Sequence, residues 1–350
     1  MKILIVGNLG YIGPSVVNQL RNTYPDGELI GYDIGYFAHN LSNAQTLPEV
    51  KLNQQIFGDI RTFPEHLLKG VDAIVDLAAI SNDPMSFKFE EVTLDINYRA
   101  AVRLAKLAKA NGVKSFVYAS SCSMYGFAAD SERKEGDQLN PLTAYARSKV
   151  KAEEELEPLA DDSFTITCHR FATACGWTNR LRLDLVLNDF VAGALANKEI
   201  SILSDGTPWR PMINTKDMAR AIDWGLSRKA ENGGKFLAVN TGSNTWNVRI
   251  LELAEAISSV IPGVKISVNP DAPPDKRSYR ANFDLFKKLA PTHQPQEDLI
   301  STVVEVRDNL MAMNFNDKNF RESTFIRLRV LDALMKEGLL NSNLEWVAKK

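Results

Sequence analysis

The chain has 350 residues, of which 45% are hydrophobic and 24% charged, and its formal net charge is −2. This composition is typical of a soluble globular protein with room for one large domain or two lobes. The near-neutral charge indicates neither a nucleic-acid partner nor a membrane surface, and no apolar run approaches the roughly 18 to 20 residues of a membrane-spanning helix. The N-terminus lacks a signal-peptide layout, and three cysteines without a CxxC pair argue against a disulfide framework. We therefore expect a reducing, cytoplasmic location.

The first predicted element is a buried apolar strand over 2–6 that passes through a glycine-rich turn into a helix. The glycines of the turn are Gly7, Gly10 and Gly13. Such a turn lets backbone N–H groups and a helix N-terminus approach a pyrophosphate. Asp33 follows the next predicted strand, 28–32, where a carboxylate accepts the 2′-hydroxyl of an adenosine ribose and repels a 2′-phosphate. The sequence therefore predicts a dinucleotide site that prefers NAD.

Two more predicted strands border this site. The strand over 55–60 contains Asp59, which either caps the adenine edge or forms a helix N-cap, and both interpretations stay open. The strand over 71–79 ends in the small or apolar residues Leu77, Ala78 and Ala79. Small side chains at the carboxyl end of a strand let a flat cofactor lie close, with simple buried packing as the alternative.

The next predicted elements lead to a serine-rich segment and a second long helix. An amphipathic helix over 91–111 carries Asn97 among apolar neighbours. The strand over 114–118 then runs into the polar segment 120–123. After a polar loop, a helix is predicted over about 142–158.

Short apolar strands alternate with helices up to about residue 163, which predicts an α/β fold with a Rossmann-type, doubly wound parallel sheet. We expect residues 1–176 to form the NAD-binding domain. Residues 177–350 are expected to form mainly a smaller, mixed α/β substrate-binding lobe, with some segments returning to the large domain. The later predicted helices span 183–197, 216–229, 247–260, 297–313 and 322–336, and the later strands span 164–170, 199–203, 235–240 and 264–268. The last helix, in the tail beyond Asn319, has no functional interpretation.

Tyr145 and Lys149 stand four residues apart in the predicted helix and therefore share one face. A tyrosine phenol is a poor base at neutral pH, but a nearby Lys⁺ and the positive nicotinamide favour the phenolate and lower its pKa. Such a tyrosine accepts a proton from a sugar hydroxyl while hydride leaves the same carbon. Ser121, at the end of the preceding strand, is placed to hydrogen-bond the same oxygen. The YxxxK pattern is common by chance, but its position 24 residues after Ser121 in a dinucleotide-binding chain favours catalysis.

These segments together resemble the extended short-chain dehydrogenase/reductase family, and within it the nucleotide-sugar epimerases and dehydratases. The matching segments are 7–13, 77–79, Asn97, 120–126 and 145–149. The resemblance implies Ser121, Tyr145 and Lys149 as the catalytic triad, with Lys149 also holding the nicotinamide ribose. It implies that Asn97 bends its helix and supports Lys149 through water. The implied NAD-binding set is Gly7, Gly10, Tyr11, Ile12, Gly13, Asp33, Asp59, Ile60, Leu77, Ala78, Ala79, Asn97, Tyr145 and Lys149.

The resemblance extends into the second half of the chain. Asn188 stands where the family binds the substrate diphosphate, and Arg210 stands where an arginine clamps it. Arg277 lies in a segment that resembles a later phosphate- or ribose-contacting loop, and Arg180 and Arg182 are further candidates, with plain solvation as the alternative. The expected substrate-binding set is Ser81, Ser121, Cys122, Ser123, Thr173, Arg182, Asn188, Arg210 and Arg277, and no metal site is expected.

Several positions depart from the family pattern. The family's 4,6-dehydratases carry Asp-Glu directly after the active-site Ser or Thr, where this chain has Cys122 and Ser123. Dehydration by the usual route is therefore disfavoured. Cys122 is either a displaced acid/base or, more simply, a small buried packing residue. Asp76 stands where many relatives have His, and Thr173 where many have Asn, so the sugar pocket stays open.

The favoured function is an NAD-dependent epimerase of a nucleoside-diphosphate sugar, most simply at C4, working by transient oxidation to a keto-sugar and hydride return. The alternatives are a nucleotide-sugar ketoreductase or a variant dehydratase of deoxysugar or surface-polysaccharide biosynthesis. A non-catalytic NAD-sensing protein is a minor alternative, because such proteins commonly lose the Tyr/Lys pair. The resemblance also implies a homodimer through a four-helix bundle of the helices at 91–111 and 142–158.

Overall fold

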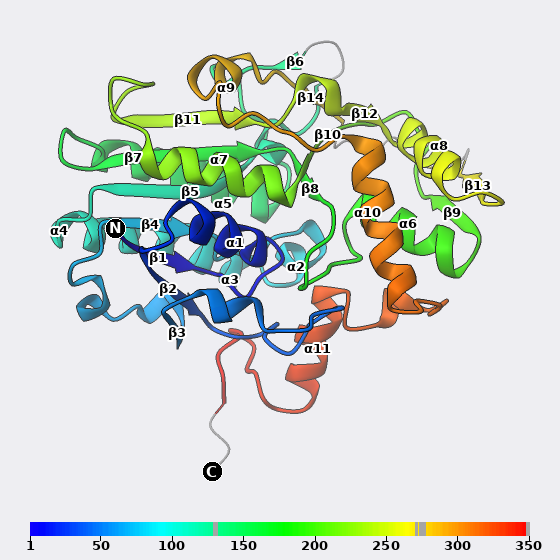
Figure 1. Cartoon of the computed structure of the whole chain (residues 1–350), viewed down its shortest axis with the longest axis horizontal. Coiled ribbons are helices and arrows are strands. Elements are labelled where there is room, and N and C mark those ends of the chain that lie inside the picture. Colours follow the sequence, from blue (N-terminus) through cyan, green and yellow to red (C-terminus); the bar gives the residue numbers. More distant parts are fainter. Residues whose placement is uncertain (129–131, 270–271, 273–277, 348–350) are drawn as a thin grey trace.

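The computed structural model describes residues 1–128, 132–269, 272 and 278–347. Its centre is a parallel sheet of seven strands in the order β11-β7-β5-β4-β1-β2-β3 (Figure 1). The strands are β1 (Lys2–Val6), β2 (Glu28–Asp33), β3 (Gln54–Phe57), β4 (Ala73–Asp76), β5 (Ser115–Ser121), β7 (Thr165–Phe171) and β11 (Phe236–Thr241). The predicted Rossmann-type sheet is therefore confirmed. β2 and β4 flank β1, so the chain reverses its winding direction there and opens a crevice at the carboxyl ends of the strands.

Alternate residues of β1 pack into two separate apolar layers. Ile3 and Ile5 belong to the layer under α1 (Gly13–Thr23) and α7 (Thr215–Ser227). Leu4 and Val6 face the opposite layer, which is covered by α4 (Ala101–Ala110) and α5 (Ala144–Leu156). Figure 1 shows the α1 and α7 layer in front of the sheet and the α4 and α5 layer behind it. Burial on both faces explains the uninterrupted apolar run of this strand.

The helix predicted over 91–111 is divided into three helical segments. These are α3 (Glu90–Leu94), a π-helical turn over Asp95–Ala100 and α4. Asn97 lies in the π-helical turn, where its side-chain amide donates to Ile80 O and Ser148 Oγ and accepts from Ile80 N. Its backbone carbonyl accepts from the Tyr118 hydroxyl at 2.6 Å. Asn97 thus links three elements that surround Lys149.

A third apolar layer forms a smaller lobe at the right of Figure 1. Its elements are α6 (Val186–Ala196), β9 (Glu199–Ile202), α8 (Ile250–Val260), β13 (Lys265–Val268) and α10 (Leu299–Ala312). α7 and β11 come from the same half of the sequence, but β11 is a strand of the large sheet and α7 packs on that sheet. The division of the chain at residue 176 stays a proposal.

Several short elements were not predicted. They are α2 (Asp83–Lys88), β6 (Glu132–Arg133), β8 (Thr173–Cys175), β10 (Trp209–Asn214), β12 (Asn247–Arg249), β14 (Arg280–Ala281) and α9 (Asp284–Leu289). β10 pairs with β8 and β12, and β6 with β14. Such strands depend on partners distant in the sequence. The predicted strand over 55–60 was too long at its end, because Asp59 accepts from Arg61 N and caps a 3₁₀ turn there.

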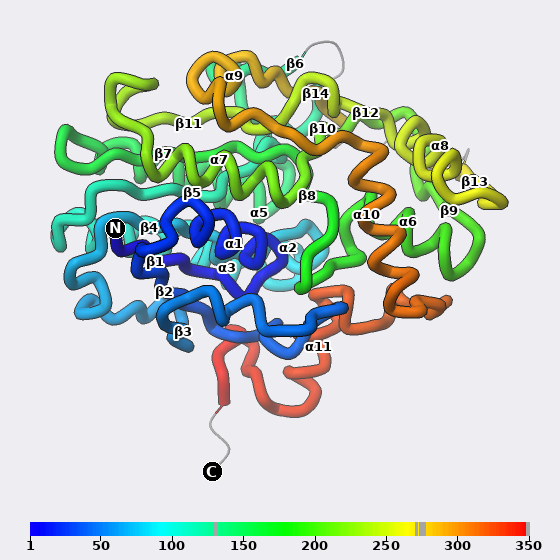
Figure 2. The backbone as a smooth tube through the Cα atoms, in the orientation of Figure 1, coloured from blue at the N-terminus to red at the C-terminus, as the bar shows by residue number. Residues whose placement is uncertain are grey.

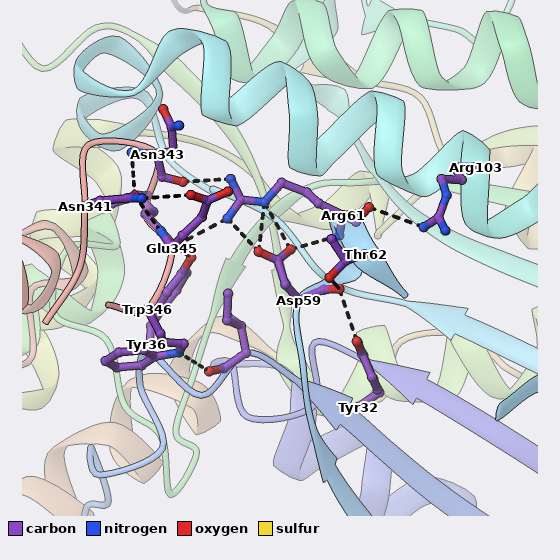
Figure 3. Close-up of polar contacts among 12 residues, drawn as sticks. Tyr32, Tyr36, Asp59, Arg61, Thr62, Arg103, Asn341, Asn343, Glu345 and Trp346 are labelled. Carbon is purple, nitrogen blue, oxygen red and sulfur yellow. Dashed lines mark hydrogen bonds and ion pairs between the residues drawn. The ribbon is translucent and has the colours of Figure 1, made fainter. Parts of the chain in front are cut away.

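The C-terminal segment passes beneath the β2 and β3 side of the sheet (Figures 1 and 2). The helix predicted over 322–336 is shorter, because a 3₁₀ turn over Phe320–Glu322 precedes α11 (Arg327–Lys336). Figure 3 shows the residues after α11 against the loop that follows β2 and the turn that follows β3. Trp346 Nε1 donates to Ile34 O at 2.8 Å, the Tyr36 hydroxyl donates to Leu344 O, and Arg61 Nη1 donates to Asn343 O at 2.7 Å.

The three cysteines, Cys122, Cys168 and Cys175, are buried free thiols. Within the described residues, every helix is too short or too polar to cross a bilayer. The cytoplasmic location stays a prediction.

Candidate active site

One cavity of about 1080 Å³ lies at the carboxyl ends of the central strands. This volume exceeds the roughly 300–1,000 Å³ usual for a small-molecule site, so there is room for a cofactor and a substrate together. The sequence-predicted residues that line it are Gly7, Gly10, Tyr11, Ile12, Asp33, Asp59, Ile60, Leu77, Ala78, Ala79, Ser81, Ser121, Ser123, Tyr145, Lys149, Thr173, Arg182 and Arg210. Four predicted residues lie behind its wall: Gly13, Asn97, Cys122 and Asn188. Arg277 lies outside the described residues.

The glycine-rich turn is packed too tightly for any side chain at two of its positions. Gly7 has φ +82°, and a Cβ there would lie 2.6 Å from Ala78 N. A Cβ at Gly13 would lie 1.8 Å from Asn8 O. Glycine at these two positions therefore lets the turn pack closely against the end of β4 and against itself, and Gly7 and Gly10 of the turn line the cavity.

Asp33 ends β2 beside this turn. Its carboxylate accepts from Leu9 N at 3.0 Å and from Gly35 N at 2.7 Å. Burial raises the pKa of Asp33, and the N–H groups of Gly35 and Leu9 act in the opposite direction. Asp59 also lines the cavity, although its carboxylate is occupied by an ion pair with Arg61 at 2.6 Å. The turn-capping interpretation of Asp59 is confirmed, and its contact with the adenine edge stays a prediction.

The serine, tyrosine and lysine come together from β5 and α5. Ser121 ends β5 and accepts from Ser123 N, and α5 begins after Thr143, whose hydroxyl caps it. Lys149 Nζ donates to Ala119 O at 2.7 Å and lies 4.3 Å from the centre of the Tyr118 ring. The same Nζ is 5.7 Å from the centre of the Tyr145 ring. All three predicted catalytic side chains therefore face one cavity.

Burial raises the pKa of Tyr145, while the Ser121 hydroxyl and the Arg182 guanidinium act in the opposite direction. The sequence argument expected Lys149 to lower this pKa. In the structure burial has the larger effect, and Lys149 Nζ is turned toward Ala119 O and the Tyr118 ring.

Asp76 is an acidic residue close to Lys149 that the predicted site did not include. It ends β4 between Val6 of β1 and Tyr118 of β5, and only 1% of its surface is exposed. Its Oδ1 accepts from Ala78 N, but its Oδ2 has no hydrogen-bond partner in the described chain. Burial raises the pKa of Asp76 and lowers that of Lys149, and each charge counteracts the shift of the other. The sequence did carry a signal for this residue, because Asp76 stands where many relatives have His.

Cys122 belongs to a buried polar network rather than to the cavity. Its thiol donates to Arg170 O at 3.0 Å, and burial raises its pKa far above the usual range. Arg170 itself forms a buried ion pair with Glu153 at 2.7 Å, and Ser120 donates to the same carboxylate. A neutral, occupied thiol behind the wall is unsuited to acid/base work, so Cys122 is not retained as a substrate contact.

Asn188 also has a structural place. Its side chain donates to the Tyr11 hydroxyl at 3.0 Å and to Arg182 O at 2.9 Å, and it accepts from Gly176 N. It is fully buried. Both ends of its side-chain amide are engaged by protein atoms, and these contacts join the glycine-rich turn to the small lobe. Asn188 is therefore not retained as a contact of the substrate diphosphate.

Among the described residues, the arginines from the second half of the chain that line the cavity are Arg182, Arg210, Arg321 and Arg327. Arg182 and Arg327 differ in how their charges are paired. Arg182 forms an ion pair with Asp184 at 2.8 Å and donates to Ser81 Oγ at 2.7 Å. Arg327, at the start of α11, also lines the cavity and is 1% exposed. The sequence analysis missed Arg327, although its spacing to Val330 and Leu331 puts a cation on the buried stripe of that helix. Arg180, by contrast, holds Phe37 O, Ala38 O and Glu49.

The chain belongs to the NAD dependent epimerase/dehydratase family, which matches residues 3–242. It is 29% identical over 267 residues to YtcB of Bacillus subtilis (strain 168), an uncharacterized UDP-glucose epimerase, across 74% of this chain and 82% of that protein. It is 23% identical over 291 residues to dTDP-D-glucose 4,6-dehydratase of Mus musculus, across 81% and 79% of the two chains. Among solved structures, MoeE5 in complex with UDP-glucose and NAD has the same fold, with a TM-score of 0.76, 22% identity, and coverage of 90% and 100%.

The protein is therefore an enzyme of an NAD-dependent family whose members include epimerases and dehydratases. The tight glycine turn and the Asp33 carboxylate fit the pyrophosphate and ribose of NAD. Within the described ranges, no group of three or more His, Cys, Asp or Glu side chains could hold a metal ion.

Proposed function

We propose that the protein epimerises a nucleoside-diphosphate sugar, most simply at C4, and leaves the redox state of its NAD unchanged overall. The observation that carries this proposal is the convergence of Ser121, Tyr145 and Lys149 on a cavity that also has an NAD-type turn. The Cys122–Ser123 pair disfavours the 4,6-dehydratase route, because neither residue is the acid that this route uses. The UDP-glucose epimerase relative is consistent with this choice.

The chain's own groups have separate roles in this proposal. Ser121 and Tyr145 hydrogen-bond the reacting sugar hydroxyl, and Tyr145 accepts its proton and later returns it. Lys149 holds a positive charge beside the phenol, and Asp76 keeps that charge on Lys149. Arg182 and Arg210 face the substrate as planar cations suited to phosphate oxygens. NAD supplies a hydride acceptor that hands the hydride back.

A deuterium label at C4 of UDP-glucose tests the reaction. We expect UDP-galactose of unchanged mass that keeps its deuterium, with no net oxidation or reduction of nicotinamide. Mass spectrometry and NMR of the product give both results. A product lighter by one water would replace the proposal by a dehydratase, and one equivalent of cofactor consumed per turnover would replace it by a ketoreductase.

The nucleotide released from denatured protein tests the cofactor side separately. We expect stoichiometric NAD⁺ or NADH, because Asp33 would repel the 2′-phosphate of NADP. Empty protein that prefers added NADPH would favour the ketoreductase.

A variant dehydratase is the second candidate, because acids from other elements line the cavity. Asp83 at the start of α2 and Asp184 beside Arg182 are both cavity residues, and Asp83 raises the pKa of Tyr145. The labelled substrate distinguishes this candidate as well, since a dehydratase loses water. A homodimer through α3, α4 and α5 stays a prediction, which sedimentation equilibrium would test.

A further inference from the structure

The C-terminal helix α11 brings a buried cation into the cavity without a complete set of partners for it. Arg327 is 1% exposed, and its Nη2 donates to Arg180 O at 2.7 Å. Its Nη1 has no hydrogen-bond partner among the described residues. A buried charged donor that stays unpaired is costly, so such a group is expected where a ligand completes it.

Arg327 lies at the cofactor end of the cavity. Its guanidinium stacks on the Phe37 ring, with Cζ 4.7 Å from the ring centre. Phe37 is in the loop after Asp33, and Arg180 holds that loop through Phe37 O and Ala38 O. Tyr11 of the glycine-rich turn also acts on the charge of Arg327. Both Phe37 and Tyr11 line the cavity. Arg327 therefore neighbours both the turn that receives the pyrophosphate of a dinucleotide and the loop after the acid that binds its adenosine ribose.

The charges around Arg327 do not neutralise its guanidinium. Burial lowers the pKa of Arg327 to about 9, and the Arg182 and Arg180 cations act in the same direction. Asp184 opposes them, but Arg182 already holds its carboxylate. α11 also begins at Arg327, so the positive end of the helix dipole adds to the local charge. An anion bound here would offset the repulsion between the arginines and accept a hydrogen bond from Nη1 of Arg327.

The segment after α11 is tied to the same end of the cavity (Figure 3). Trp346 Nε1 holds Ile34 O, and the Tyr36 hydroxyl holds Leu344 O. Arg61, which is paired with Asp59, donates to Asn343 O. Ile34, Tyr36 and Asp59 line the cavity. The tail thus holds α11 against the adenosine side of the site, which keeps Arg327 in position.

We infer that Arg327 is a dinucleotide-binding residue that donates from Nη1 to the pyrophosphate oxygens of NAD, and that the C-terminal segment is part of the cofactor site. This inference rests on the NAD dependence of the family and does not require the proposed epimerisation. It gives a binding role to a part of the chain that lies outside the matched family region of 3–242.

Calorimetric titration of the nucleotide-free full chain with NAD⁺, ADP-ribose, adenosine and UDP tests the inference without turnover. For Arg327→Met we expect the Kd for NAD⁺ and ADP-ribose to rise about 10- to 100-fold, because charge-assisted hydrogen bonds to phosphate are lost. Adenosine has no phosphate, so its Kd should stay within about twofold. Arg327→Lys keeps the charge without the planar fork and should give an intermediate loss.

Arg329→Met is the matched control, because Arg329 lies on the same helix but is exposed and paired with Glu322. Its Kd values should equal those of the unmodified protein. Unchanged ADP-ribose binding in both Arg327 variants would overturn the inference, as would an equal loss for adenosine. A loss for UDP alone would assign Arg327 to the substrate diphosphate instead, and would equally overturn it.

Discussion

Two walls of the same cavity differ in how their charges are balanced. The catalytic wall, our name for the face formed by the proposed catalytic residues Ser121, Tyr145 and Lys149, comes from β5 and α5. Its Lys149 has both a carbonyl partner and a nearby carboxylate in Asp76. The arginine wall, formed by Arg182 and Arg327, comes from the second half of the chain. There Arg182 is paired with Asp184, but Nη1 of Arg327 has no hydrogen-bond partner in the part of the chain that the structure describes. Arg182 therefore stabilises the fold through its ion pair while it also lines the cavity, whereas the unpaired donor of Arg327 needs a ligand to complete it.

The largest expected effect lies on the catalytic wall. We expect Tyr145→Phe to lower kcat about 10²- to 10⁴-fold, because the proton acceptor is lost while the ring remains. The unfolding midpoint and the Kd for NAD⁺ should stay unchanged, which calorimetry checks. Tyr98→Phe is the matched control, since the Tyr98 hydroxyl contacts Glu155 on an exposed helix face. A kcat within tenfold of the unmodified enzyme would remove Tyr145 from the proposed mechanism.

The same substitution at the two arginines sharpens the comparison further. Arg182→Met should lower the free energy of unfolding by about 3 kcal/mol, because it leaves the Asp184 carboxylate buried without its cation. Arg327→Met should leave that free energy unchanged or raise it, because it removes an incompletely paired buried charge. Urea denaturation of the nucleotide-free proteins measures both. Equal losses of unfolding free energy in Arg182→Met and Arg327→Met would mean that the two arginines do not differ in how their charges are paired.

The loss of unfolding free energy in Arg182→Met should also depend on pH. Although burial acts the other way, the Arg182 charge lowers the net pKa of Asp184 below its usual value. A carboxyl with a lowered folded-state pKa stabilises above its unfolded pKa, and this stabilisation is lost as pH falls through the folded pKa. The difference between Arg182→Met and the unmodified protein should therefore be full at pH 7 and shrink toward acid. A difference that grows on acidification would contradict this pairing.

The smallest predicted effect concerns Asp76. Burial lowers the pKa of Lys149, and the Asp76 charge counteracts that shift. Asp76→Asn should therefore lower the pKa of Lys149 further and move the alkaline limb of the kcat profile about one pH unit toward neutrality. Asp72→Asn, at an exposed position just before the start of β4, is the control. Coincident profiles for all three proteins would show that Asp76 does not act on the catalytic lysine.

Local signals in the sequence account for the parts of the site that were predicted well. The strand, turn and helix from 2 to 23 form one continuous unit, so the positions of Gly7 and Asp33 followed from spacing alone. Tyr145 and Lys149 were placed on one face of α5 by the helical period. Ser121 joined them because neighbouring parallel strands bring their carboxyl ends to one edge of the sheet.

The sequence by itself thus determined the doubly wound sheet, the glycine-rich turn with Asp33 beside it, and the grouping of Ser121, Tyr145 and Lys149, because these depend on contacts within a few residues or on strand order. Only the tertiary structure decided which distant polar groups complete one another. Asn188 joins Tyr11 and Gly176 instead of facing the cavity, Asp76 faces Lys149, and Arg327 arrives from the tail. Burial and pairing between residues far apart in the chain set these states, and local patterns only mark Asp76 and Arg327 as unusual without naming their partners.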